Sequence, residues 1–169
     1  MTIKKTKKIA KKLLSAKDHF VLGKHGIGFV NDTFLNHFGD TTFEKSEKPP
    51  VFQKLPRDMN DAAIESELKP GFCELGDVLA FLENPPEGTK DGYANLFYTP
   101  SFVVFVLWLR FYGHWGVSAW RRHVSDWDTD TRVFSPANFV PSKPLTPEHS
   151  DSLALPDTLV INGVKYKKV

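Results

Sequence analysis

The sequence predicts an α+β fold in which a mainly antiparallel sheet carries a few short helices. Three patterns favour it: an aromatic, β-branched segment from about residue 95 to 135, short capped helical runs before it, and a hairpin signal at the C-terminus. With 169 residues, 41% of them hydrophobic, the chain can bury one moderate core. The expected parts are a lysine-rich arm (1–17), a globular domain (18–137), a proline-rich linker (138–157) and a hairpin (158–169).

The N-terminal arm is strongly basic. Residues 1–24 hold eight lysines against Asp18, a net charge of +7, so the rest of the chain carries −5 of the overall +2. Apolar residues recur at helical spacing within 3–16, which predicts a short amphipathic helix. A basic arm on an acidic body can bind an anionic partner, fold back on its own domain or stay solvated. The lysines are Lys4, Lys5, Lys7, Lys8, Lys11, Lys12, Lys17 and Lys24.

Two short apolar runs follow the arm, at residues 20–22 and 27–30, and glycines separate them. This arrangement predicts two strands around a turn. Asp32 or Thr33 is then a suitable N-cap for a helix over residues 34–38, because short polar side chains satisfy free backbone N–H groups at a helix start.

The next stretch predicts a loop and two short helices. Residues 40–56 are poor in apolar side chains and contain a Lys-Pro-Pro sequence, so we expect a surface loop. Asn60 is a suitable N-cap for a helix over 61–68, and Asp77 for a helix over 78–83.

The segment 102–112 decides the fold class. Eight of its eleven residues are β-branched or aromatic, which favours a central strand buried on both faces. Thr99 and Pro100 also suit the start of a helix, so a helix over this segment is the alternative. On the strand interpretation, the alternating residues 115–120 form a second strand and residues 132–135 a third, giving an antiparallel meander.

The C-terminal region combines a linker and a hairpin. Prolines recur through 138–157, which predicts an extended linker. Asn162-Gly163 supplies the positive φ angles of a type I′ turn, so residues 158–169 predict a hairpin that docks on the body or on a partner. Its register pairs Ile161 with Val164 and Leu159 with Tyr166.

Three segments together resemble a known but uncharacterised family of small domains in metagenomic bacterial proteins. They are residues 92–98 (GYANLFY), the hairpin with Trp108 and residues 115–119 (WGVSA), and Trp127 followed by 132–135 (RVFS). The likeness runs from about Phe20 to Ala137 and leaves the arm and the terminal hairpin outside. It implies a single recurring bacterial domain, and it transfers no activity and no functional residue.

Several protein classes are disfavoured by composition. The single Cys73 excludes an intramolecular disulfide and fits a reducing compartment. The longest apolar run, 102–109, has eight residues, against roughly 20 for a membrane-spanning helix. No secretory signal pattern is seen, so we expect a cytoplasmic chain without a membrane span. The glycine-rich residues 23–28 lack the order of a phosphate-binding loop, and no cofactor is expected.

An alternating acidic run offers a weak metal-site candidate. Asp126, Asp128 and Asp130 are spaced like the first three ligands of a calcium loop. Thr131 stands where that loop needs glycine, and Ala137 where it needs a bidentate glutamate. A turn with solvated acids is therefore the preferred interpretation.

The favoured functional hypothesis is a non-enzymatic binding protein. Lysines in the arm would contact an anionic partner, most simply nucleic acid, and exposed tryptophans beside arginines would allow stacking on bases. Buried tryptophans would instead belong to the core. The candidate contact residues are Lys4, Lys5, Lys7, Lys8, Lys11, Lys12, Arg121 and Arg122.

Two alternatives come from other functional classes. The acidic body could bind a basic partner protein, as a small adaptor or inhibitor does, with the edge of the terminal hairpin open to strand addition. A hydrolase could instead assemble a site from His114 or His123 with the aspartates at 126, 128 and 130, with or without a metal.

Overall fold

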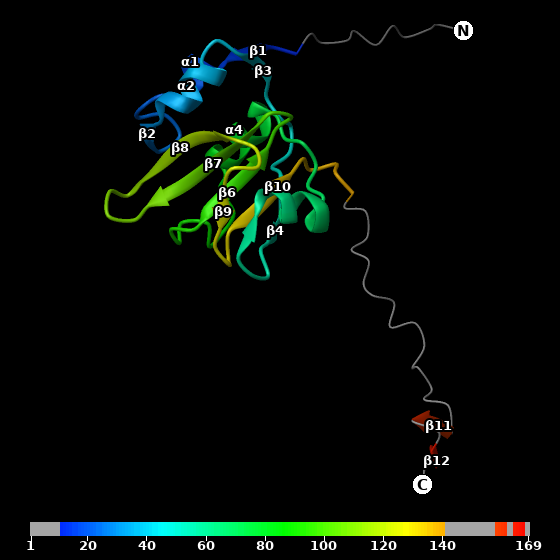
Figure 1. Ribbon diagram of the computed structural model, residues 1–169. Helices are drawn as coiled ribbons and strands as arrows, with labels where there is room; N and C mark the ends of the chain where they lie inside the picture. The colour runs from blue at the N-terminus through cyan, green and yellow to red at the C-terminus, as the bar shows by residue number, and fades with distance from the viewer. Residues whose placement is uncertain (1–10, 141–157, 162–163, 168–169) are drawn as a thin grey trace, which may run out of the picture.

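The computed structural model describes residues 11–140, 158–161 and 164–167, and its body is built on a six-stranded mixed sheet (Figure 1). No helix in these ranges is long and apolar enough to cross a membrane. The strand order is β2 (Ile27–Val30), β8 (His114–Arg121), β7 (Phe102–Leu109), β6 (Ala94–Tyr98), β10 (Arg132–Ser135) and β4 (Val51–Lys54).

The centre of the sheet is an antiparallel meander of β6, β7 and β8. Val104 of β7 lies between Phe97 of β6 and Ala119 of β8. The strand prediction for residues 102–112 is thus confirmed and the helix alternative is excluded. The branched and aromatic residues of β7 pack on both faces of the sheet, as a central strand requires.

The third strand of the predicted meander lies elsewhere. β10 does not follow β8 in the sheet; it runs parallel to β6 on the far side of the meander, and β4 closes that edge in antiparallel pairing. The loop predicted for residues 40–56 is therefore wrong at Val51–Lys54. Pro49 and Pro50 directly precede this edge strand. Proline is tolerated there, because its missing N–H removes no hydrogen bond between strands.

Of the two strands predicted at residues 20–22 and 27–30, the second forms as β2, but the first does not, so the predicted hairpin is wrong. β2 pairs in parallel with β8, and the residues before it form α1 (Ala16–His19) and a turn. Phe20 is fully buried, so its apolar run marks core packing and not a strand.

The last turn of the predicted N-terminal helix is a strand. β1 (Leu13–Ser15) pairs in antiparallel fashion with β3 (Thr42–Glu44), which also lies in the predicted loop. Ala16, directly after β1, is buried, so the body begins within the region assigned to the arm.

The short helices were predicted well, with small shifts in their caps. α2 (Asp32–Phe38) is capped by Asn31, whose side chain accepts a hydrogen bond from the Thr33 N–H. Asn60 caps α3 (Asp61–Ala63), which continues as the π-helix η1 (Ile64–Leu68). In α4 (Leu75–Glu83), Asp77 lies inside the helix and forms a capping box with Glu74.

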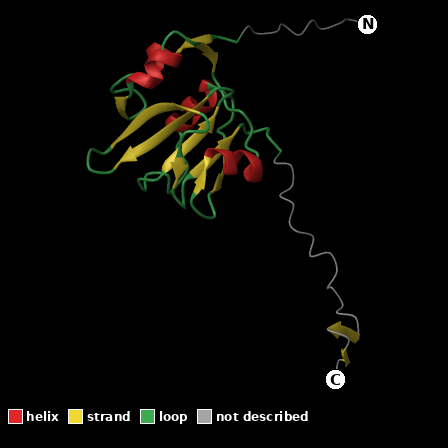
Figure 2. Ribbon diagram, in the orientation of Figure 1, coloured by secondary structure: helices red, strands yellow, loops and turns green. Residues whose placement is uncertain are grey.

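The two faces of the sheet carry separate hydrophobic clusters. Figure 2 draws in red the helices that pack on the sheet. The first face packs on α4, α1 and α2, with Phe81 of α4 against Phe97, Trp115 and Phe134. The second face is covered in part by η1 and by the two-stranded pair β5 (Met59–Asn60) and β9 (Asp126–Trp127).

The C-terminal hairpin forms with the predicted register. β11 (Thr158–Ile161) pairs with β12 (Val164–Lys167), with Ile161 opposite Val164 and Leu159 opposite Tyr166. The prediction that this hairpin docks on the body or on a partner stays a prediction, and most of the linker before it lies outside the described residues.

Candidate functional site

The four tryptophans divide unequally between core and surface. Trp115 and Trp127 are buried, with 2% and 7% of their surface exposed, and Trp108 is half-buried against Trp115. Trp120 is different, because 43% of its surface is exposed. Trp115 and Trp127 are therefore core residues, and Trp120 is the most exposed of the four tryptophans.

Part of the second sheet face has no covering layer. Gly116 lies on this part, and a Cβ placed on it would point at Leu109 Cδ1 and Phe29 Cδ1, 3.4 and 3.7 Å away. Register places Leu107 opposite Gly116. We call this surface the open face: Phe29, Tyr93, Phe105, Leu107, Leu109 and Trp120, around the small residues Gly116 and Ser118.

The tip of the β7–β8 hairpin continues the open face. Phe111 is fully exposed and Tyr112 is 75% exposed, at a turn that projects at the left in Figure 1. Gly113 adopts a φ of +67° there, and its N–H closes the turn onto the Leu109 carbonyl over 2.8 Å. The tip is therefore an ordered turn that displays two aromatic rings.

An aromatic cavity of about 270 Å³ lies at the other end of the open face. The rings of Trp120 and Trp127 stack with centroids 5.6 Å apart, and Phe105 meets Trp120 edge-on at 4.6 Å. The residues that line it are Gly92, Tyr93, Ala94, Phe105, Leu107, Trp120, Asp126, Trp127, Asp128 and Thr131.

A buried carboxylate fixes the wall of this cavity. Asp61 is 1% exposed, and its Oδ1 accepts hydrogen bonds from the Trp127 indole over 2.8 Å and the Tyr98 hydroxyl over 2.7 Å. Its Oδ2 accepts from the N–H groups of Val124 and Ser125, each at 3.2 Å. Burial, together with the neighbouring Asp61, raises the pKa of Tyr98. The carboxylate is saturated with donors, so its role is structural.

Arg122 is engaged inside the protein. It forms a bidentate ion pair with Glu65, donates to the Pro100 carbonyl over 2.7 Å and lies over the Phe72 ring. These hydrogen bonds from Arg122 hold the pKa of Glu65 below its usual range. Of the two arginines proposed for nucleic-acid contact, only Arg121 is exposed at the end of β8.

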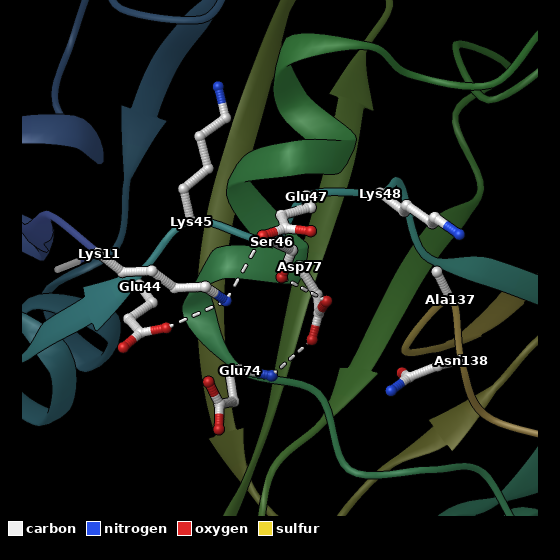
Figure 3. Close-up of a pocket in the computed structure, with 10 residues that line it drawn as sticks. All are labelled: Lys11, Glu44, Lys45, Ser46, Glu47, Lys48, Glu74, Asp77, Ala137 and Asn138. Atoms are coloured by element: carbon white, nitrogen blue, oxygen red, sulfur yellow. Dashed lines mark hydrogen bonds and ion pairs between the residues drawn. The ribbon is translucent and has the colours of Figure 1, made fainter. Parts of the chain in front are cut away.

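Most of the lysines predicted to contact nucleic acid lie outside the residues that the structure describes. Lys4, Lys5, Lys7 and Lys8 are not among the described residues, and Lys12 is exposed. Lys11 lies 3.4 Å from Glu44 and 3.7 Å from Glu47, at a polar cavity of about 340 Å³ that Figure 3 shows.

The acidic side chains of this polar cavity are paired with groups inside the protein. Asp77 accepts from the Ser46 hydroxyl over 2.7 Å and the Glu74 N–H over 2.9 Å, both drawn in Figure 3. Lys45 turns to Glu83, 2.5 Å away. Because its acids are met by lysines or hydrogen-bond donors, we assign this cavity a structural role at the junction of β1, β3 and α4.

The acidic run does not assemble a metal site. Asp126 lies in β9, and Asp130 lies 3.7 Å from Lys54 at a φ of +73°. The Asp128 carbonyl accepts from the Thr131 N–H, which makes a turn. Within the described residues, no group of three His, Cys, Asp or Glu side chains is placed to hold a metal ion.

The two histidines of the hydrolase hypothesis are far apart. His114 begins β8 and stacks on Tyr112, whereas His123 follows the end of that strand, 3.9 Å from Glu65. Eight strand residues separate the ends of β8 by roughly 23 Å, so a site of this kind would use one of the two histidines and not both, and the hydrolase hypothesis stays a prediction.

Cys73 is buried. Burial, with a further contribution from Asp77, raises the pKa of its thiol. Since the thiolate is the reactive form, Cys73 is a poor nucleophile.

Comparison with protein-family models, with curated proteins and with solved structures finds no match to this chain. The resemblance to the metagenomic bacterial family stays a prediction. The open face and its exposed hairpin tip were not predicted from the sequence, because the spacing of aromatic residues does not tell which ring a second layer will cover.

Proposed function

We propose that this chain is a non-enzymatic binding protein and that a partner protein docks on the open face and the hairpin tip. The observation that carries this proposal is the full exposure of Phe111 beside the uncovered rings of the sheet. Burying one such side chain stabilises a contact by about 1.5–3 kcal/mol, and exposed apolar patches of this kind mark interaction sites.

The architecture suits such a role. Most of the open face belongs to β7 and β8, which pair over eight residues each and pack on the first hydrophobic cluster on their other side. Because this backbone is already ordered in the free protein, binding a partner should cost little conformational entropy. Its aromatic residues resemble the anchors that dominate protein interfaces, whereas lysines at the arm would supply affinity without selectivity.

A photo-crosslinking experiment tests this proposal. The photoreactive amino acid benzoylphenylalanine replaces Phe111 in the full chain, in cells that produce it, and Val124 in a control. Val124 is also apolar and 69% exposed, but lies beyond the far end of β8. We expect one adduct from position 111 that is missing from position 124.

The protein identified in the adduct is then purified, and its affinity for variants of this chain is measured. Phe111→Ser should weaken binding at least about tenfold, in line with loss of an aromatic anchor, while Val124→Ser leaves it unchanged. Equal affinity of the two variants, or the same adducts from both positions, would contradict docking on this face. Adducts formed only with nucleic acid would support the basic-arm hypothesis in its place.

A further inference from the structure

The aromatic cavity combines ring faces with negative charge. Trp120, Trp127 and Phe105 form its ring wall, and Asp126 and Asp128 lie at its rim. Both aspartates are exposed. The residues that line it within the described chain include these two carboxylates and no basic side chain.

Two of the cations near the cavity form ion pairs with other acids. Lys54 pairs with Asp130, and Arg132 pairs with Asp91. Arg110 lies near the lining residue Gly92, since a Cβ placed on that glycine would come within 3.0 Å of its Nε, but Arg110 itself does not line the cavity. Across the described residues, neither Asp126 nor Asp128 forms an ion pair through its side chain, so their charge is free to act on a ligand.

We propose that this cavity receives one cationic side chain, lysine or arginine, and this inference rests on the proposed function for the partner protein that supplies it. Cations bind over the faces of Trp and other rings because the ring quadrupole attracts them, and a carboxylate nearby adds to that attraction. A nucleic-acid backbone is disfavoured, because its phosphates would meet the two aspartates.

The cavity is organised before its ligand arrives. The Trp127 ring is fixed by its hydrogen bond to Asp61, and Phe105 sits in the middle of β7. Thr131 is buried at the base, between the Asp128 turn and β10. Of the three rings of the wall, Trp120 is the most exposed, so we expect binding to register on its indole N–H.

A titration of the purified full chain tests the inference without the partner. The probe is Nα-acetyl-arginine methylamide, and its neutral control is the citrulline derivative of the same shape. The readout is the indole N–H signal of Trp120 in an NMR spectrum of the 15N-labelled protein, assigned with Trp120→Phe. We expect the arginine probe to shift this signal with a dissociation constant in the millimolar range, and the citrulline probe to leave it in place.

Two matched variants test whether the aspartates at the rim of the cavity bind the cation. The double variant Asp126→Asn, Asp128→Asn should weaken binding of the arginine probe about fivefold or more, and Asp40→Asn, an exposed aspartate next to α2, should leave it unchanged. Equal shifts with citrulline, full affinity in the double variant, or no shift at about 50 mM probe would overturn the inference. Because no partner is present, these outcomes are independent of the crosslinking result at Phe111.

Discussion

Trp127 donates its indole N–H to Asp61 across 2.8 Å, and this bond ties the small β5–β9 layer to α3 beneath the aromatic cavity. Asp61 begins α3, so one carboxylate joins a helix start, a strand pair and the wall of the cavity. The geometry of the cavity therefore depends on a residue that does not line it.

Removing this carboxylate should destabilise the fold. Asp61→Ala leaves the Trp127 and Tyr98 donors and two backbone N–H groups without their acceptor, so we expect a loss of about 3 kcal/mol or more in the free energy of unfolding. Urea unfolding followed by tryptophan fluorescence measures it. Asp40→Ala, at an exposed position, should change stability by less than about 0.5 kcal/mol. A comparable change in both variants would show that Asp61 does not hold the layer.

The exposure of Trp120 has a spectroscopic consequence. Acrylamide quenches solvent-exposed indoles, and we expect Trp120→Phe to remove the largest share of the quenchable emission. Trp108→Phe, at a half-buried ring, should remove less, and Trp115→Phe almost none. If quenching persists unchanged in Trp120→Phe, the open face is covered in solution.

The buried Arg132 holds the turn that leads to the cavity. It is 2% exposed, lies 2.5 Å from Asp91 and donates to the Gly88 carbonyl over 2.8 Å. Burial acts to raise the pKa of Asp91, but hydrogen bonds from Arg132 and from the Tyr93 N–H, together with the charge of Arg132, lower it overall.

Asp91→Ala should therefore destabilise the protein by about 3–5 kcal/mol, because it leaves a buried charge unpaired. Lys54→Gln removes an exposed ion pair with Asp130 and should cost at most about 1 kcal/mol. Hydrogen exchange of residues 88–93 should accelerate in the first variant alone. Equal losses of stability in the two variants would argue against the buried pair as an anchor.

His25 should make stability fall at mildly acid pH. Its ring stacks on His19 at 5.9 Å, and burial lowers its pKa below 6.5. Glu83 acts to raise this pKa, whereas His19, Lys24 and Lys45 act to lower it. The unfolded chain then binds a proton that the folded chain resists, so this contribution is present above pH 6.5 and is lost as the pH falls toward the folded pKa.

His25→Asn should flatten this pH dependence, since asparagine accepts the left-handed backbone, with a φ of +52°, that His25 adopts. The measurement is urea unfolding at intervals from pH 7.5 to 5. His114→Asn is the control, and it should retain the loss of stability on acidification. An unchanged slope in His25→Asn would assign the effect to another group.

The sequence predicted local structure better than it predicted pairing. Capping by Asn60 and the hairpin of β7 and β8 follow from short-range chemistry, and both formed. The parallel pairings of β10 with β6 and of β2 with β8 join segments far apart in the chain, and no local residue pattern specifies which strands meet. The four-residue edge strand β4 follows two prolines, so its composition resembled a loop.

The same limit applies to the candidate site. Spacing alone does not separate Trp120 from Trp127, because only β9 and its contact with Asp61 bury the second ring and leave the first half-exposed. The sequence does not show that Arg122 is unavailable to a ligand, because its partner Glu65 lies 57 positions away and pairs with it only in the folded chain.

Hydrogen exchange on the complex is the sharpest test of whether a partner protein docks on the open face and the hairpin tip. With the partner recovered by crosslinking at Phe111, we expect slower exchange at residues 107–113 and 118–121, and unchanged exchange in α2 and β3. Protection confined to β3 and the polar cavity at Lys11, with the hairpin tip exchanging as in the free protein, would contradict it.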